Sequence, residues 1–366
     1  MEKRDFTIKQ EIGVDNLGPA QRHLDNVSEE YFEAINKCDD NEFLSFKRKL
    51  EPIYKFSTNP RSIVSVGVGG GLELRVLADL FKDSDTRIIG IDLSQKAIKK
   101  AGKYLVEHKI KASLVQSSAI QMPFKYDNCE IGGIVLSAVM HEVYSYVDEG
   151  KSVWKKAVLE SVTTLSDNGI LLLRDFAGPS INDFVEVSFL NEKVRGFYNY
   201  FRQRFRTFKT WDDDDAEKMK DKRLSFDDYP PLPEEETFLR LPFGLVAEMV
   251  LHFKNYNSDL KSGLIKAYSN SWKEIDERYL IPDPDLESIN IMDPEKYKEK
   301  VLECSNQKLR LQGYKLECLA MNVVDRPETN EELKKYFSIK HETHGQDALF
   351  KQITSKMELV FKKSKI

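Results

Sequence analysis

Between residues 62 and 174, short apolar runs alternate with longer amphipathic segments. Strands are predicted at 62–66, 87–91, 112–115, 130–136 and 169–174. Helices are predicted at 72–81, 94–108 and 151–165, where apolar residues recur at helical spacing. Ser94 stands where the cap of the second of these helices is expected. Because strands alternate with helices, the segment predicts a parallel sheet with right-handed crossovers.

The flanking segments follow different patterns. Apolar positions between 31 and 54 recur at helical spacing, and the pattern breaks between about 180 and 245. Two late strand candidates lie at 314–324 and 356–362. The predicted organisation is therefore a helical N-terminal cover at 1–60, an α/β core at 61–179, an inserted helical cap at 180–310, and C-terminal strands at 311–366 that complete the sheet.

Composition narrows the class of protein. The chain has 366 residues, of which 41% are hydrophobic and 31% charged, as in a globular protein, and a net charge of −5 offers nucleic acid no overall attraction. We expect no membrane span and a cytoplasmic location, since no apolar run approaches ~18 residues and the first residues lack the apolar segment of a signal peptide. The four cysteines form no CxxC pair, so neither a disulfide framework nor a metal site is expected.

A glycine-rich loop follows the first predicted strand and precedes a helix. It reads SVGVGGGL, with spaced glycines at Gly67, Gly69 and Gly71. Glycines at a helix N-terminus let a ligand approach unpaired backbone N–H groups. A dinucleotide fingerprint needs its third glycine at the position of Leu72, so this GxGxG spacing disfavours a nicotinamide dehydrogenase. A purely structural turn is the alternative interpretation.

An acid ends the second predicted strand. Asp92 follows the loop by about 20 residues, which is the separation expected of a carboxylate that binds ribose hydroxyls. The alternative is a helix-capping aspartate, but Ser94 already fills that role.

The loop and Asp92 resemble those of class I S-adenosylmethionine-dependent methyltransferases. The resemblance covers about 62–175 and extends to QSSAIQMPF at 116–124, to 131–143, and to LSDNGILL at 165–172. It implies a Rossmann-like, seven-stranded, mostly parallel sheet and S-adenosylmethionine as the cofactor. The cofactor-binding residues that it implies are Gly67, Gly69, Gly71, Asp92, Leu93, Ser118, Ala119 and Ser137. Ser65 and Ser118 stand where the family usually has acids, so a binding protein that retains the fold without turnover is one alternative.

The acceptor side is predicted at the carboxyl ends of the fourth and fifth strands, where ligands bind in open α/β sheets. Histidine titrates near neutrality, which makes His141 a candidate base. The other catalytic candidates are Glu142 and Asp175, and Tyr144, Tyr146 and Arg174 are candidates for substrate contact. The alternatives are packing roles for His141 and the tyrosines, and a mutual ion pair between Arg174 and Asp175.

The segment 193–211 combines aromatic and basic residues. Phe197, Phe201, Phe205 and Phe208 share one helical face, with arginines around the remainder. This pattern suits either RNA binding or a lid helix whose phenylalanines pack inward. The predicted function is methyl transfer to O, N or C of a small or medium-sized acceptor. The alternatives are an RNA or nucleotide methyltransferase, a catalytically inactive binding protein, and another reaction of the same cofactor.

Overall fold

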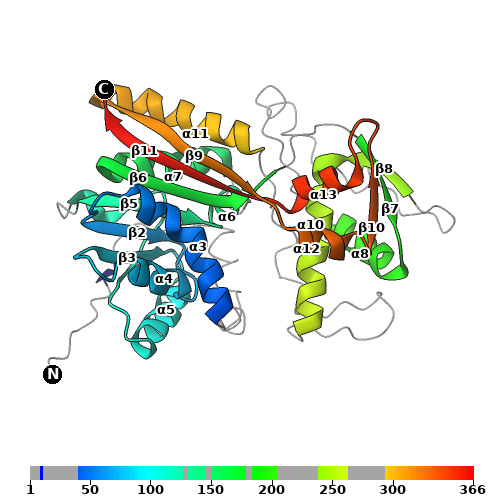
Figure 1. Cartoon of the computed structure of the whole chain (residues 1–366), viewed down its shortest axis with the longest axis horizontal. Coiled ribbons are helices and arrows are strands. Elements are labelled where there is room, and N and C mark those ends of the chain that lie inside the picture. Colours follow the sequence, from blue (N-terminus) through cyan, green and yellow to red (C-terminus); the bar gives the residue numbers. More distant parts are fainter. Residues whose placement is uncertain are drawn as a thin grey trace. The chain divides into compact units, whose positions relative to one another are not determined.

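The computed structural model describes residues 9–10, 40–126, 130–145, 150–178, 184–204, 238–262 and 293–366. The chain divides into two compact units, both visible in Figure 1. Unit 1 comprises Met1–Asp175, Lys298–Asn322 and Glu358–Ile366, and unit 2 comprises Phe176–Tyr297 and Val323–Met357.

Unit 1 is built on one large sheet. Its strands are β1 (Lys9–Gln10), β2 (Ser62–Val66), β3 (Arg87–Asp92), β4 (Ser113–Gln116), β5 (Ile131–Ser137), β6 (Leu165–Phe176), β9 (Tyr314–Val324) and β11 (Lys356–Lys365). They are ordered β1-β4-β3-β2-β5-β6-β11-β9, and every printed pairing from β1 to β6 is parallel. Apart from the two-residue β1, this is the predicted seven-stranded, mostly parallel Rossmann-like sheet, so the fold class is confirmed.

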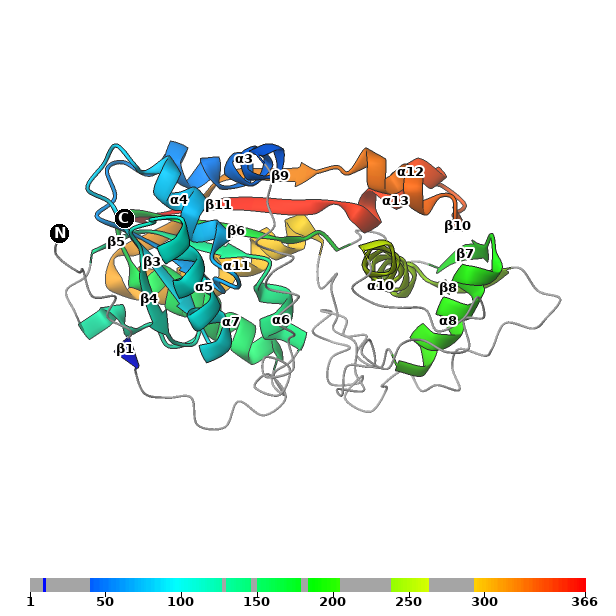
Figure 2. The same cartoon turned by 90° about the horizontal axis from the view of Figure 1, so that it is seen from below.

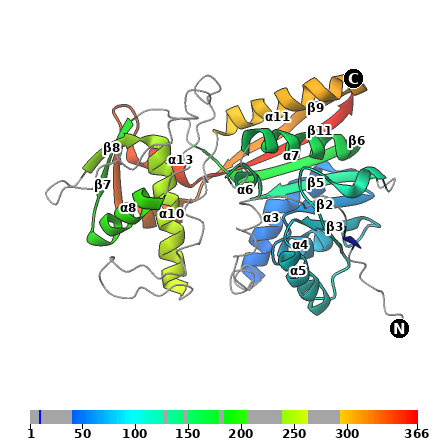
Figure 3. The same ribbon diagram turned by 180° about the vertical axis from the view of Figure 1, so that it is seen from behind.

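The position of β11 distinguishes this sheet from a dinucleotide-binding one. Numbered among themselves in chain order, the seven longer strands run 3-2-1-4-5-7-6. The dinucleotide-binding arrangement runs 3-2-1-4-5-6. Here the last strand in the sequence therefore lies between the fifth and the sixth. Its first residues lie next to the end of β6, as Figures 1 and 3 show.

Helices cover both faces of the sheet. On one face, α3 (Asp40–Phe56), α4 (Leu72–Leu80) and α5 (Gln95–Glu107) share one apolar core with the strands. Figure 2 shows α7 (Gly150–Thr164) and α11 (Pro294–Leu309) on the opposite face from α3 and α4. The short helix α6 (Met140–Ser145) follows β5. The Ser94 side chain accepts a hydrogen bond from the Ala97 N–H, so the predicted cap of α5 is present.

The N-terminal region is only partly described. Within the predicted helical cover, α3 buries Leu50 and Ile53 against the sheet. Lys9 and Gln10 instead form a parallel strand with β4, which the helical pattern did not predict. Residues 1–8 and 11–39 lie outside the described part.

Unit 2 contains an antiparallel sheet. The strands β7 (Phe184–Phe189), β8 (Phe238–Pro242) and β10 (Phe337–Lys340) lie in the order β10-β7-β8. Its helices are α8 (Glu192–Arg204), α10 (Phe243–Ser262), α12 (Pro327–Leu333) and α13 (Gln346–Thr354). Strand β7 alternates exposed and buried residues, and Val187 lies opposite both Leu239 and Ile339. The region predicted as a partly irregular helical cap thus contains strands, and Val323–Met357 belongs to this unit rather than wholly to the large sheet.

Among the described residues, the structure has no helix that is long and apolar enough to cross a bilayer.

Candidate functional site

The glycine loop joins β2 to α4 and adopts a left-handed backbone at each spaced glycine. Gly67, Gly69 and Gly71 have φ angles of +75°, +49° and +102°, a region that residues with a side chain rarely adopt. The Gly67 N–H donates to the Ile91 carbonyl over 2.8 Å, which ties the loop to β3. The backbone conformation by itself therefore favours glycine at all three positions, before any contact with neighbouring side chains is considered.

The three glycines differ in what surrounds them. A Cβ on Gly67 would clash with Val139, and one on Gly71 would lie 3.1 Å from the Ala101 Cα atom. A Cβ on Gly69 would meet nothing within 4 Å. Packing explains Gly67 and Gly71, whereas at Gly69 the backbone is open to an approaching molecule.

Asp92 lies at the end of β3, beside the loop. Its Oδ2 accepts from the Gly69 N–H over 3.2 Å and its Oδ1 from the Ser94 N–H over 2.8 Å. The side chain is buried, and the loss of solvation raises the pKa of its carboxyl to about 6, although the backbone hydrogen bonds oppose the shift. Asp92 therefore orders the loop, and it also places carboxylate oxygens beside Gly69, where the backbone is open.

Leu93, Ser118 and Ala119, three other predicted cofactor residues, lie on turns held beside Asp92. The Leu93 carbonyl accepts from Gln116 Nε2 over 3.1 Å, and the Ser117 N–H donates to the Asp92 carbonyl over 2.9 Å. These bonds hold the turn that carries Ser118 and Ala119 close to Asp92. Both residues are half-buried.

One buried acceptor close in sequence to Asp92 was not indicated by the sequence. Gln95 is the first residue of α5, next to Ser94. Its Oε1 atom is buried and accepts no hydrogen bond from the described residues. A buried acceptor without a donor is costly, so a ligand donor at this point would be favourable.

A second acid, which the sequence analysis missed, approaches the loop from α4. Ser65 Oγ donates to Glu73 Oε1 over 2.6 Å, so a carboxyl group lies beside the serine that stands in place of the family's acid. Glu73 is buried, and desolvation raises the pKa of its carboxyl to about 7 against the effects of Ser65, Arg174 and Ser137. The available signal was a charged residue between the apolar Leu72 and Leu74.

The structure joins two of the predicted acceptor-side residues. His141 Nδ1 lies 2.7 Å from Asp175 Oδ1, and the His141 backbone N–H donates to Asp175 Oδ2 over 3.0 Å. Both side chains are buried. One carboxylate thus fixes both the ring and the backbone of the histidine, and with Nδ1 engaged, proton transfer would use Nε2.

Arg174 bonds to Glu358 and Ser137, whereas the sequence analysis had suggested an ion pair with Asp175 as the alternative. Its Nε donates to Glu358 Oε1 over 2.9 Å and its Nη1 to Ser137 Oγ over 3.1 Å. Ser137, predicted as a cofactor contact, therefore accepts from this guanidinium. Glu358 comes from β11, 184 positions along the chain, where no local pattern could reveal it.

The remaining acceptor-side candidates are less well placed. Glu142 is half-buried on α6. Tyr144 lies on the same helix, but its side chain is outside the described part, as is the whole of Tyr146. Their predicted contacts with substrate stay predictions.

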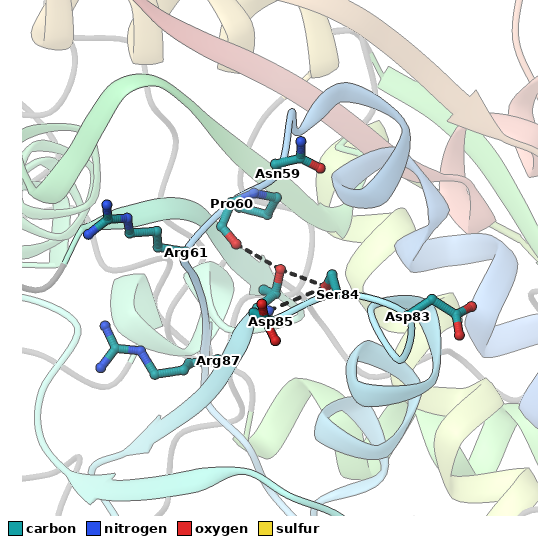
Figure 4. A pocket seen from close by; sticks show the side chains of 8 residues that line it. Asn59, Pro60, Arg61, Asp83, Ser84, Asp85 and Arg87 are labelled. Carbon is teal, nitrogen blue, oxygen red and sulfur yellow. Dashed lines mark hydrogen bonds between the residues drawn. The ribbon is translucent and has the colours of Figure 1, made fainter.

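A surface depression lies at the opposite end of the strands. Residues 59–61 and 83–87 line it, at the amino ends of β2 and β3 (Figure 4). Thr86 Oγ1 donates to the Pro60 carbonyl over 2.7 Å and Ser84 Oγ donates to Thr86 Oγ1 over 2.8 Å. This depression lies at the opposite end of the strands from the glycine loop, and within it Ser84, Thr86 and the Pro60 carbonyl bond to one another.

The aromatic face of the 193–211 segment is buried as far as the structure describes it. Phe197 and Phe201 of α8 belong to the apolar core of unit 2, and the Phe197 ring packs edge-to-face on Phe253 at 5.3 Å. This observation supports the packing interpretation for these two residues. Phe205 and Phe208 lie outside the described residues.

The fold and the site together define the class of protein. A sheet ordered 3-2-1-4-5-7-6, a left-handed GxGxG loop after its first strand and an acid after the second are those of a Rossmann-like methyltransferase domain, a class whose methyl donor is S-adenosylmethionine.

A family model agrees with this class over part of the chain. Residues 63–156, about a quarter of the chain, match the family model described as "Methyltransferase domain". The plantazolicin methyltransferase BamL, solved with a triazolic desmethylPZN analog and SAH, is 13% identical, with a TM-score of 0.43 over 94% of each chain. The YcgJ protein from Bacillus subtilis is 11% identical, with a TM-score of 0.40 over 87% of this chain and 99% of its own. No curated protein matches the chain.

Proposed function

We propose that this protein binds S-adenosylmethionine at the carboxyl ends of β2 and β3 and transfers its methyl group to a small or medium-sized acceptor. The observation that carries the proposal is the opening at Gly69, with the buried Asp92 carboxylate hydrogen-bonded to its N–H. The sulfonium of the cofactor supplies an activated methyl group. The task of the protein is then to align the acceptor with that group.

The residues of the chain divide this work. The Gly67–Gly71 loop and Asp92 hold the cofactor, with Leu93, Ser118 and Ala119 around the adenosine. The pair of His141 and Asp175 favours an acceptor that loses a proton, such as a hydroxyl or an amine, because a carboxylate that orients Nδ1 leaves Nε2 to accept the proton. Transfer to a carbon acid by the same base is the remaining possibility.

Calorimetric titration with S-adenosylmethionine and S-adenosylhomocysteine tests the cofactor site. We expect micromolar binding that Asp92→Ala weakens at least ~10-fold, which is about 1.4 kcal/mol. Asp85→Ala is the matched control, because Asp85 is an exposed aspartate near the amino end of β3, and it should bind like the wild type. If neither ligand binds the wild type, the proposal is wrong, and a fold retained for another purpose replaces it.

Methyl transfer itself is tested with methyl-labelled S-adenosylmethionine and a panel of small phenols, carboxylates and amines. With any acceptor that is methylated, His141→Gln should lower kcat about 10²–10⁴-fold, the usual contribution of a general base, and leave affinity for S-adenosylhomocysteine unchanged. Transfer RNA serves as the comparison acceptor. The burial of Phe197 and Phe201 weighs against base stacking on these two rings.

A further inference from the structure

A chain of buried polar groups crosses the carboxyl edge of unit 1 beside the glycine loop. Ser65 of β2 bonds to Glu73 of α4, and Ser137 of β5 and Glu358 of β11 both bond to Arg174 of β6. Arg174 and Ser137 also act on the Glu73 carboxyl, Arg174 through its charge. All five residues belong to unit 1 and form one connected network.

The charges of this network do not balance. It holds two carboxyl groups, Glu73 and Glu358, and one guanidinium, Arg174, whose Nε is engaged with Glu358. The hydrogen bonds that Glu73 receives come from neutral hydroxyls, those of Ser65 and Ser137. Burial without a directly paired cation disfavours the carboxylate, so Glu73 holds its proton to a higher pH than an exposed glutamate does, and a positive charge beside it would favour release of that proton.

Several charged groups on the neighbouring elements have partners other than Glu73. On α3, Lys47 pairs with Asp79 over 2.6 Å. At the end of β3, Asp92 accepts from the Gly69 and Ser94 amides, and on α5 the Tyr104 hydroxyl accepts from Arg75 of α4. His141 Nδ1 pairs with Asp175 Oδ1 over 2.7 Å.

We propose that Glu73 is the receptor for the ammonium group of the bound cofactor, and that it gives up its proton when that ammonium binds. The inference rests on the proposed function, because it needs a ligand whose amino-acid end lies at the loop. Glu73 follows Gly71 by two residues, so its carboxyl belongs to the same loop-to-helix turn. The balance is simple: a carboxylic acid and an ammonium give a carboxylate–ammonium pair, and one proton passes to the buffer.

Calorimetry at about pH 6.5, in buffers of different ionisation enthalpy, counts the protons released on binding. S-adenosylhomocysteine carries the ammonium, whereas 5′-methylthioadenosine has the same ribose and adenine without it. We expect wild-type protein to release roughly 0.5–1 more proton with the first ligand than with the second, since the acid is largely protonated below a pKa of about 7. A proton lost from Asp92 would appear equally with both ligands.

Two variants isolate the acid. Glu73→Gln should remove the extra proton and weaken S-adenosylhomocysteine at least ~10-fold while leaving 5′-methylthioadenosine unchanged. Because Ser65 Oγ lies 2.6 Å from Glu73 Oε1, the double variant Ser65→Asp with Glu73→Gln returns a carboxyl to this place and should restore both the release and the affinity. The exposed acid Glu130, changed to Gln, is the control and should behave as the wild type.

The outcomes separate the two proposals. If wild-type protein binds S-adenosylhomocysteine with the same proton count as 5′-methylthioadenosine, the role of Glu73 is overturned and the cofactor site stands. The role of Glu73 is also overturned if the Glu73→Gln variant still releases the extra proton, provided that a cooperative thermal unfolding transition shows the variant to be folded. If wild-type protein binds none of these ligands, both proposals fall.

Discussion

The two edges of the parallel sheet carry charged groups in opposite environments. At the carboxyl edge, Arg174 and Glu358 pair with side-chain exposures of 8% and 10%. At the amino edge, Arg61 and Glu130 pair with exposures of 76% and 54%. Buried charges have lost their water, so each must find a partner in the protein or in a ligand, whereas exposed charges need none. The difference explains why the carboxyl edge, and not the depression in Figure 4, is where a ligand is expected.

The largest effect is expected from breaking the buried ion pair at the carboxyl edge, with the exposed pair at the amino edge as the comparison. Arg174→Met should lower the free energy of unfolding by about 3–5 kcal/mol, since it leaves Glu358 buried without its cation. Arg61→Met removes an exposed pair and should cost under about 1 kcal/mol. Urea unfolding of both variants measures the difference. Equal losses would show that burial does not distinguish the two edges.

The next effect concerns the glycine loop. Gly67→Ala should lower the free energy of unfolding by about 2–4 kcal/mol, because a positive φ and a clash with Val139 act together. Gly313 also has a positive φ, of +78°, but a Cβ there meets nothing within 4 Å. Gly313→Ala should therefore lose only the backbone part, about 1–2 kcal/mol, and thermal or urea unfolding compares the two. A loss at Gly313 as large as that at Gly67 would contradict the packing argument.

A smaller effect is expected in the dependence of stability on pH. The pKa of Glu73 is raised by burial from 4.5 to about 7 in the folded chain, so the folded state holds this proton more tightly than the unfolded state does. Its contribution to stability is complete below about pH 4.5 and is lost as the pH rises to about 7. The free energy of unfolding of the wild type should therefore fall across this range relative to Glu73→Gln, by an amount on the order of 1–3 kcal/mol. Urea titrations at successive pH values measure this difference, and parallel profiles would contradict it.

The smallest effect expected is a gain. Ser118→Asp places a carboxylate where the family usually has an acid, and a charged acceptor binds an amino group more strongly than a hydroxyl does. S-adenosylhomocysteine should then bind roughly threefold more tightly, by about 0.6 kcal/mol. Ser84→Asp makes the same change at the amino edge and should leave affinity as it was. Calorimetry distinguishes the two, and weaker binding to Ser118→Asp would argue against an adenine at this turn.

Local patterns predicted most of unit 1. The bounds of β2 and β9 agree with the predicted 62–66 and 314–324, and Ser94 caps α5 as expected, because these features depend on neighbouring residues. The pairing of β10 with β7 was missed, since Phe337 lies opposite Phe189 from a distant part of the chain. Within the site, the pattern identified Gly69, Asp92, His141 and Asp175 as candidates. It missed Glu73, whose significance depends on Arg174 and Ser65.

Strand β11 has a consequence for how the protein is made. It is the last strand of the large sheet to leave the ribosome, yet it lies between β6 and β9, and most of unit 2 is synthesised before it. Until β11 arrives, Arg174 lacks Glu358 and the sheet is split, so the nascent chain presents two unpaired strand edges. Such long-range pairing is slow to form and is exposed to aggregation while it waits. The position of β11 between β6 and β9 brings Glu358 to Arg174, so the polar network can be completed only late in biosynthesis.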